Sequence, residues 1–328
     1  MTRVALVGAL LLLAPYALTG CGSEDTASAS SGQTRTVTDV EGTTMEVPAH
    51  PTRIVTLSEP TLDAVLALGV TPVGTSAGRG QSGAGSYLGK KAAGIEIVGQ
   101  VAAPDYEAIG KLKPDLILTD GTSINNNPDM LTVLRKIAPT FYTGYAGGDW
   151  RTNFGYVAAA LNMTAEGKQV EQHYDDAVSA AKKKLTRYRQ DTFSIVRWQG
   201  SSASLILEEL PAGEALTDLG LSRPASQDRD GSGHSEPVSN ENLTDIDADH
   251  MFFGTIGGSS ETNRNAGGGT GVAAARKALA QAEKVPGFTD LTAYQNHQIL
   301  LVDGSLWTST GGPLLMEGIV ASVVEALT

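Results

Sequence analysis

One pattern of residues occurs twice in this chain, in the segments 107–118 and 241–252, and it limits the possible folds more than any other feature. Both segments carry a glutamate, two apolar residues, an aspartate and two further apolar residues at identical offsets. The positions are Glu107, Ile109, Leu112, Asp115, Ile117 and Leu118 in the first segment, and Glu241, Leu243, Ile246, Asp249, Met251 and Phe252 in the second. This spacing predicts a short helix, a turn at the aspartate and a strand in each segment. We therefore expect two halves of related structure.

Short apolar runs alternate with helical patterns from Thr36 onward. Strands are expected at 53–57, 70–75, 116–119, 140–143, 193–198, 251–253 and 299–302. Helices are expected after the first of these strands, with Pro60 in the first turn and Gly69 at the end, and again at 129–137 and 313–327. Such alternation is typical of a parallel sheet with helices on both faces. We predict an α/β fold with two lobes of this kind.

A long charged segment, 162–190, separates the two halves. It is rich in Ala, Lys, Glu and Gln. Most of it, from about Ala165, is expected to form one helix of about 24 residues, roughly 36 Å long. The predicted organisation is therefore an N-terminal lobe at 36–161, a rigid linking helix at 162–190 and a C-terminal lobe at 191–328.

The start of the chain is expected to direct export. Arg3 precedes an apolar run that ends in small residues, as a secretory signal does, and that is shorter than the roughly 20 apolar residues of a membrane span. The string Leu18-Thr19-Gly20-Cys21 resembles the lipobox of bacterial lipoproteins. It implies a signal peptide at 1–20, a lipid on Cys21 and a place on the extracytoplasmic face of the cell membrane. The alternative is an ordinary cleaved signal with an incidental cysteine, although Cys21 is the only cysteine of the chain. Residues 21–35 lack periodicity and are expected to form a flexible tether.

The charge of the chain argues against one class of partner. Without residues 1–20, which contain one Arg, the chain has 23 basic and 36 acidic side chains. A nucleic-acid-binding protein needs a basic surface, so a nucleic-acid partner is excluded. An anionic small ligand is not excluded, because a few arginines in a cleft dominate the local field.

Loops that follow the predicted strands are expected to line a cleft between the lobes, because ligands of such folds bind beyond the carboxyl ends of strands. These loops include 58–59, 226–236 and 305–310. Aromatic residues and arginines gather in or beside the loops and suit a broad, often anionic ligand. The candidate ligand-binding residues are Arg79, Tyr87, Tyr142, Tyr145, Trp150, Arg151, Arg197, Trp198, Arg229 and Trp307. For a single Trp the alternative is a core position, and for a single Arg it is a solvated surface position.

The order and spacing of several segments resemble the iron-siderophore, haem and cobalamin binding proteins that serve ABC importers. The segments are Pro51 to Leu57, Gly69 to Gly74, Val98-Gly99, Asp105 to Glu107, Lys113 to Ile117, Val238 to Leu243, Trp307 and Gly311 to Pro313. The resemblance covers nearly everything after the tether. It implies two Rossmann-like lobes bridged by one long helix, as in class III periplasmic binding proteins, with limited hinge motion. It further implies a monomer that delivers its ligand to a dimeric membrane permease.

The resemblance also gives a role to the repeated glutamates. It implies that Glu107 and Glu241, one on each lobe, dock onto arginines of the permease. The alternative is that both acids only complement the dipole at the first turn of their helices. The matching offsets in the two lobes favour docking.

Within this family, haem binders commonly offer a Tyr or a His to the iron. Candidate haem-iron ligands here are Tyr87, Tyr142, Tyr145 and His234. A ferric siderophore needs no protein ligand, and no pair of the 5 histidines has metal-ligand spacing. We expect a ferric siderophore as the transported ligand, with haem as the alternative, no direct bond from the protein to a metal and no cofactor.

Two other classes of protein remain as hypotheses. The segment Gly78 to Gly83 matches the dinucleotide fingerprint and follows a strand, which would suit a nucleotide-dependent oxidoreductase. Residues 84–87 do not favour a helix start, however, and the phosphates would lack a helix N-terminus. A structural or adhesive surface lipoprotein would need neither the aromatic and arginine-rich loops nor the paired glutamates. We therefore expect a binding protein and not an enzyme.

Overall fold

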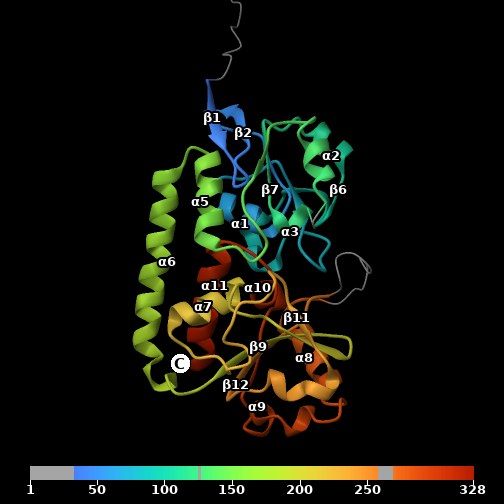
Figure 1. Ribbon diagram of the computed structural model, residues 1–328, viewed down its shortest axis with the longest axis vertical. Helices are drawn as coiled ribbons and strands as arrows, with labels where there is room; N and C mark the ends of the chain where they lie inside the picture. The colour runs from blue at the N-terminus through green and yellow to red at the C-terminus, as the bar shows by residue number, and fades with distance from the viewer. Residues whose placement is uncertain (1–32, 125–126, 258–268) are drawn as a thin grey trace, which may run out of the picture. The chain divides into compact units, whose positions relative to one another are not determined.

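Two large β-sheets with helices packed on them and a two-stranded hairpin make up the part of the chain that the computed structural model describes, residues 33–124, 127–257 and 269–328 (Figure 1). Cys21 and most of the predicted tether lie outside the described residues. Within those three ranges, no helix has the length and apolar character that a membrane crossing requires.

The N-terminal sheet has six strands in the order β6-β5-β4-β3-β7-β8. All neighbours are parallel except β5 and β6. The strands are β3 (Ile54–Thr56), β4 (Gly74–Ala77), β5 (Glu96–Gln100), β6 (Ala103–Pro104), β7 (Leu116–Thr119) and β8 (Thr140–Tyr142). The helices are α1 (Glu59–Ala67), the 3₁₀ helix η1 (Ser86–Ala92), α2 (Tyr106–Lys111), α3 (Gly121–Ile124), α4 (Asp129–Leu134) and α5 (Trp150–Ala160). The predicted parallel α/β lobe is confirmed.

The C-terminal sheet has five strands in the order β11-β10-β9-β12-β13. The strands are β9 (Phe193–Gln199), β10 (Ser202–Leu205), β11 (Glu236–Val238), β12 (His250–Gly254) and β13 (Ile299–Leu301). β9, β12 and β13 are parallel, as predicted. β10 and β11 add two antiparallel strands that the sequence pattern did not indicate, and Gly200 makes the β9–β10 turn with a left-handed φ of 61°.

Several helices accompany the C-terminal sheet. They are α7 (Pro211–Leu219), η3 (Asn240–Ile246), α8 (Val272–Ala282), η4 (Phe288–Asp290), α9 (Thr292–Gln295), α10 (Gly304–Trp307) and α11 (Pro313–Leu327). The last helix has the predicted bounds. Pro313 occupies its first turn, and Leu315, Ile319 and Val323 form a buried stripe at helical spacing.

Two segments differ in extent from the predicted organisation. A hairpin of β1 (Thr34–Thr38) and β2 (Thr44–Pro48) begins inside the predicted tether, so Thr34 and Arg35 belong to a strand. The linking helix α6 (Thr164–Lys184) is shorter than the predicted segment, and a 3₁₀ turn, η2 (Thr186–Tyr188), follows it. Three lysines in its last turn complement the negative end of the helix dipole.

The repeated sequence pattern has the same structure in both halves. In each half the aspartate precedes a strand and accepts two hydrogen bonds from a threonine that precedes the neighbouring parallel strand. Asp115 accepts from the N–H and hydroxyl of Thr52 at 2.9 and 3.0 Å, and Asp249 accepts from the same groups of Thr192 at 2.8 and 2.8 Å. Because β3 pairs with β7 and β9 pairs with β12, the two aspartates occupy equivalent places in the two sheets.

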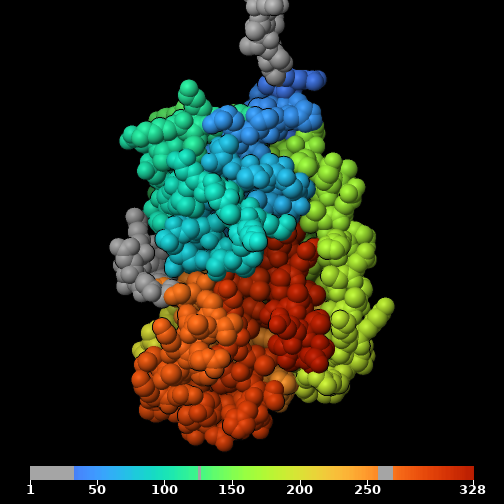
Figure 2. Space-filling view, turned by 180° about the vertical axis from the view of Figure 1, so that it is seen from behind, coloured from blue at the N-terminus to red at the C-terminus, as the bar shows by residue number. Residues whose placement is uncertain are grey.

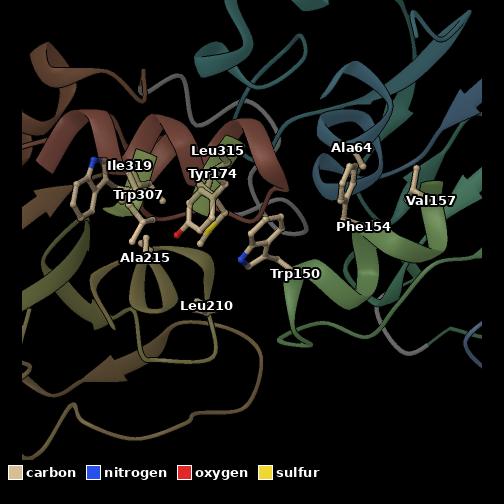
Figure 3. Packing of buried hydrophobic residues seen from close by; sticks show 14 of the residues in the cluster. Ala64, Trp150, Phe154, Val157, Tyr174, Leu210, Ala215, Trp307, Leu315 and Ile319 are labelled. Atoms are coloured by element: carbon tan, nitrogen blue, oxygen red, sulfur yellow. The ribbon is translucent and has the colours of Figure 1, made fainter. Parts of the chain in front are cut away.

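A continuous hydrophobic core connects the two halves. It contains residues of both sheets and of α5, α6, α7 and α11. Trp150 of α5, Tyr174 of α6 and Leu315 of α11 lie together at its centre (Figure 3). On the surface, α11 (red) lies against α6 (yellow-green) below the N-terminal half (Figure 2). Shared packing of this kind limits the motion of one half against the other.

A buried carboxylate fastens α11 to the N-terminal half. Asp63 of α1 is fully buried, and its two oxygens accept the backbone N–H groups of Leu314 and Leu315 at 2.8 and 2.9 Å. These N–H groups belong to the first turn of α11 and have no partner within the helix. The hydroxyl of Tyr87 donates a third hydrogen bond, at 2.7 Å. Burial raises the pKa of Asp63 to about 6, against the lowering effect of these hydrogen bonds.

We expect the stabilisation by Asp63 to weaken as pH rises from about 4 to 6. The pKa of this carboxyl in the unfolded chain is about 3.9, and its pKa in the folded protein is higher. Folding is therefore favoured by protonation of Asp63, and this contribution to stability is lost as pH rises from the unfolded pKa through the folded pKa. Urea unfolding of wild type and Asp63→Asn at pH 4.5 and 7.0 measures this effect. The difference in unfolding free energy between the two proteins should shrink by on the order of 2 kcal/mol at the higher pH. Asp129→Asn, at an exposed first-turn position of α4, is the control. A difference that grows with pH would contradict the expectation.

Candidate ligand-binding site

A cavity of about 180 Å³ lies where residues of the two halves meet. The N-terminal half contributes Arg79, from the loop after β4, to the lining of the cavity. The C-terminal half supplies Arg197 and Gln199 of β9, Ile206, Leu210, Gly233, His234, Ser235, Ile256, Thr308, Ser309 and Thr310. The lining is mainly polar, and none of these residues is a Phe, Tyr or Trp.

Glu59 fixes Arg79 in this cavity. It lies in the first turn of α1, where Ser58 forms the capping box, and only 5% of it is exposed. Its Oε1 accepts the backbone N–H of Arg79 at 2.9 Å, and its Oε2 lies 3.6 Å from the guanidinium. The same carboxylate accepts the hydroxyls of Ser309 at 2.8 Å and Thr310 at 3.3 Å. Glu59 therefore joins the N-terminal half to the chain that leads into α11.

Arg197 differs from Arg79 because no carboxylate forms an ion pair with it in the described part of the chain. Its guanidinium donates to the carbonyl of Thr308 at 3.2 Å and to the hydroxyl of Ser235, and its Nε is buried without a hydrogen-bond partner. Burial, and then the positive charge of Arg79, lower the pKa of Arg197 to about 10, while the charge of Glu59 acts in the opposite direction. The side chain is still a cation at neutral pH, and a nearby anion would stabilise it.

Two glycine-containing loops contact each other next to the cavity, and one of them contributes Gly233 to its lining. Gly147 of the N-terminal half and Gly233 of the C-terminal half both have left-handed φ, 69° and 77°. A Cβ atom on Gly147 would lie 2.4 Å from the Cα of Gly233, and one on Gly233 would lie 2.5 Å from the carbonyl oxygen of Ala146. The carboxylate of Glu209 holds the second loop by accepting the N–H groups of Gly231 and Gly233. Glycine is therefore required on both sides of this contact.

A more open groove of about 430 Å³ begins at the same contact, since Gly147 also lines it. Carboxylates dominate the groove: Asp149, Glu208, Glu209, Glu214, Asp218 and Asp230. Burial, with the charges of Asp149 and Asp218, raises the pKa of Glu214 to about 8. The groove is therefore unfavourable for an anion, unlike the cavity.

The structure brings three of the predicted residues to the cavity, namely Arg79, Arg197 and His234. Two others, Trp150 and Arg151, line the acidic groove. The Arg151 guanidinium is 2.7 Å from Asp175 and 3.8 Å from Asp218, and it lies 4.5 Å above the Trp150 ring. Arg151 is thus already paired.

Trp198 and Trp307 do not line the cleft, contrary to expectation. They are 1% and 0% exposed. Trp198 packs on Phe253 and Phe288, and Trp307 stacks on Phe252 with ring centroids 4.0 Å apart. Both indole N–H groups have hydrogen-bond partners, Gly200 and Ser322. They occupy the core position that a large apolar ring favours.

The remaining predicted residues lie outside the cavity lining. The hydroxyl of Tyr87 donates to Asp63, and burial raises the pKa of Tyr87 well above its usual value. Burial also raises the pKa of Tyr142, which meets Tyr145 edge to face. Tyr145 is 53% exposed, and Arg229 is exposed and pairs with Glu236. An iron-binding tyrosine must lose its proton, so Tyr87 and Tyr142 are poorly suited to that role.

Sequence reasoning did not single out Glu59, Ser235 or Thr308 to Thr310, although the predicted loops 58–59, 226–236 and 305–310 contain them. The sequence could have indicated Glu59 as a site residue, because it lies directly after a predicted strand and in the first turn of a predicted helix. For the hydroxyl residues there was no distinguishing signal, because Ser and Thr are common in loops.

The repeated glutamates have similar local surroundings. Glu107 and Glu241 are exposed and stand in the first turns of α2 and η3. Asp105 accepts the N–H of Glu107 at 3.0 Å, and the hydroxyl of Ser239 accepts the N–H of Glu241 at 3.2 Å. Glu107 also pairs with Lys111 at 2.8 Å. Each half therefore presents a capped helix start with an exposed glutamate.

The glycine-rich segment at 78–83 forms a closed turn, in which Gly78 donates to the carbonyl of Gly83 at 2.8 Å. The next element is the 3₁₀ helix η1, with no side-chain cap. The segment therefore does not lead into an α-helix N-terminus that could hold a pyrophosphate. Across the described ranges, no group of three His, Cys, Asp or Glu residues is placed to hold a metal ion.

Comparisons with known proteins agree with this architecture. The family model for periplasmic binding proteins matches residues 54–306. The chain is 34% identical over 255 residues to the probable siderophore-binding lipoprotein YfiY of Bacillus subtilis, covering 75% of this chain and 77% of that one. It is 28% identical over 322 residues to the Fe(3+)-citrate-binding protein YfmC of the same organism, covering 94% and 92%.

One solved structure is similar to this chain over most of the length of both proteins. The crystal structure of Staphylococcus aureus SirA complexed with staphyloferrin B superposes with a TM-score of 0.72 at 26% sequence identity, covering 89% of this chain and 98% of SirA.

Proposed function

Because the chain belongs to the periplasmic binding protein family, we propose that it captures a ferric siderophore outside the cytoplasm and delivers it to an ABC importer. The observation that carries this proposal is the cavity between two α/β lobes, where an arginine from each lobe is present. Members of this family are transport proteins that bind solutes and are not enzymes. The turn at 78–83 likewise offers no nucleotide site.

The relatives support an iron chelate as the ligand. YfiY is named as a probable siderophore-binding lipoprotein, YfmC as a ferric citrate-binding protein, and SirA was crystallised with staphyloferrin B. The site itself argues against haem. The described residues of the cavity lining include no Phe, Tyr or Trp, and the Tyr87 hydroxyl is already bound to Asp63. His234 does line the cavity, and its Nδ1 lies 3.0 Å from the carbonyl oxygen of Ser235. A saturated ferric siderophore needs no protein ligand to its metal.

The size of the cavity bears on how a ligand enters. At about 180 Å³ it is smaller than the roughly 300–1,000 Å³ of typical ligand sites. We propose that the two halves separate slightly at the contact between Gly147 and Gly233, which involves only backbone atoms. Because α6 and the shared core cross between the halves, this motion is small.

We expect calorimetry of the full chain in detergent to show saturable binding of at least one ferric siderophore with a Kd below about 1 μM, which corresponds to roughly 8 kcal/mol. Hydroxycarboxylate, hydroxamate and catecholate chelates form the panel. Haem should leave its Soret band unshifted. Failure of every ferric chelate to bind, or tight binding of haem with a shifted Soret band, would reject the siderophore proposal.

We propose that Glu107 and Glu241 dock onto a dimeric permease. One protein monomer must present a ligand to a two-fold pore, and one exposed glutamate on each half matches this symmetry. Exposed ion pairs contribute only about 0.2–1 kcal/mol each, so these contacts orient the protein more than they hold it.

Replacing both residues, Glu107→Ala with Glu241→Ala, should lower uptake of the ferric siderophore at least tenfold and leave its affinity in solution unchanged. Uptake of radioactive iron by cells and calorimetry of the purified protein give the two measurements. The control carries Glu41→Ala with Glu325→Ala, which removes one exposed glutamate from each half at other places. Wild-type uptake by the first variant would exclude the docking role.

We propose that Cys21 carries a lipid that anchors the mature chain to the membrane. One acyl chain binds a bilayer only marginally, whereas two or more chains hold firmly, so a diacylated cysteine is expected. Cells grown with an alkyne-labelled fatty acid should incorporate it into wild type and not into Cys21→Ala. The intact mass of the mature protein should fit a chain that begins at a modified Cys21. An unmodified mature chain that begins at another residue would refute the anchor.

A further inference from the structure

We infer that the ligand is a ferric chelate of the hydroxycarboxylate kind, with a carboxylate held between Arg197 and Arg79. This inference rests on the proposed function and narrows it to one chemical class of siderophore. Three independent features of the cavity carry it: an unbalanced positive charge, a lining of hydrogen-bonding groups, and the absence of aromatic residues.

The unbalanced charge belongs to Arg197. Its partners, the Thr308 carbonyl and the Ser235 hydroxyl, are neutral, and its Nε is buried without a partner. A buried cation without a counterion is costly, because its hydration is lost and not replaced. A carboxylate in the cavity would supply the missing negative charge.

Arg79 does not relieve this imbalance. Its charge is balanced by Glu59, whose oxygens are already occupied by Ser309, Thr310 and the backbone N–H of Arg79. The charge of Glu59 also acts on Arg197 and raises its pKa, but the two side chains form no direct ion pair. The nearby Asp120 is fully buried, accepts from Thr122 and Ser123, and does not line the cavity. The lining as a whole favours a ligand with negative charge.

The shape of the two guanidinium groups favours a ligand that carries carboxylates. A guanidinium is planar, and its parallel N–H groups match the two oxygens of a carboxylate. Gln199, Ser235 and Thr310 surround the arginines with further donors and acceptors. Hydroxyl and carboxylate oxygens of a citrate-like chelate are suitable partners for these groups.

Two other chelate classes fit less well. A ferric trihydroxamate is neutral and would leave Arg197 without a counterion. A ferric triscatecholate is anionic, but its rings would find no Phe, Tyr or Trp to stack on among the described residues of the lining. The acidic groove beyond Gly147 gives no alternative place for an anion, because six carboxylates line it.

The test compares ferric citrate, a neutral ferric trihydroxamate and a ferric triscatecholate by calorimetry on the full chain in detergent. Wild type should bind ferric citrate at least tenfold more tightly than the other two. Arg197→Gln should weaken ferric citrate binding at least 30-fold. Arg197→Lys keeps the positive charge but lacks the parallel N–H groups of the guanidinium, and it should give an intermediate loss of affinity. Arg276→Gln, at an exposed position of α8, is the matched control and should behave as wild type.

Thermal unfolding separates a binding role of Arg197 from a structural one. Since no described carboxylate forms an ion pair with this cation, Arg197→Gln should leave Tm unchanged or raise it, while affinity falls. A lower Tm with unchanged ferric citrate affinity would assign Arg197 to the fold and overturn the inference.

The binding panel also separates failure of this inference from failure of the proposed function. Tighter binding of the hydroxamate or the catecholate than of ferric citrate would overturn the hydroxycarboxylate assignment and leave siderophore capture standing. Absence of binding by all three chelates would overturn both.

Discussion

The carboxylate of Asp63 binds residues 251 and 252 positions further along the chain, and the position of the final helix depends on it. Its two oxygens take the first free N–H groups of α11, which packs on α6 and α7 and against α1. One helical turn earlier, Glu59 binds Ser309 and Thr310, directly before α11. The two acids of α1 therefore hold one face of the cavity and the helix that supports it. A shift of α1 would move both.

The cavity contains one arginine whose charge is neutralised by a carboxylate and one without such a partner among the described residues. This difference connects the stability of the fold with ligand binding. Glu59 neutralises Arg79 and fixes its direction, so the N-terminal half contributes an ordered group. Arg197 has no ion-pair partner in the described ranges, and its Nε has no hydrogen bond, which costs folding free energy. Such a cost is expected where a ligand, and not the protein, supplies the counterion. The acidic groove on the other side of the Gly147–Gly233 contact restricts an anion to the cavity.

The elements with a clear local pattern were predicted well. The helix at 313–327 and the strands around 54–56, 116–119 and 250–254 follow from apolar periodicity and from Pro and Gly at their ends. The repeated aspartates identified two equivalent turns, which the hydrogen bonds of Asp115 and Asp249 confirm. β10 and β11 were not predicted because they are short and carry few apolar residues, and their pairing with β9 stabilises them.

By itself the sequence determined most of the parallel strands, the final helix, the two related halves and the loops at the strand ends, because these depend on the spacing of neighbouring residues. Only the tertiary structure decided which side chains in those loops remain available to bind a ligand. Arg151 and Arg197 looked alike in the sequence. Asp175 and Asp218 neutralise Arg151, whereas no described carboxylate pairs with Arg197. Trp198 and Trp307, placed beside loops, are enclosed by Phe252, Phe253 and Phe288. The balance of charge and the burial of a ring depend on residues brought from distant parts of the chain, which no local pattern specifies.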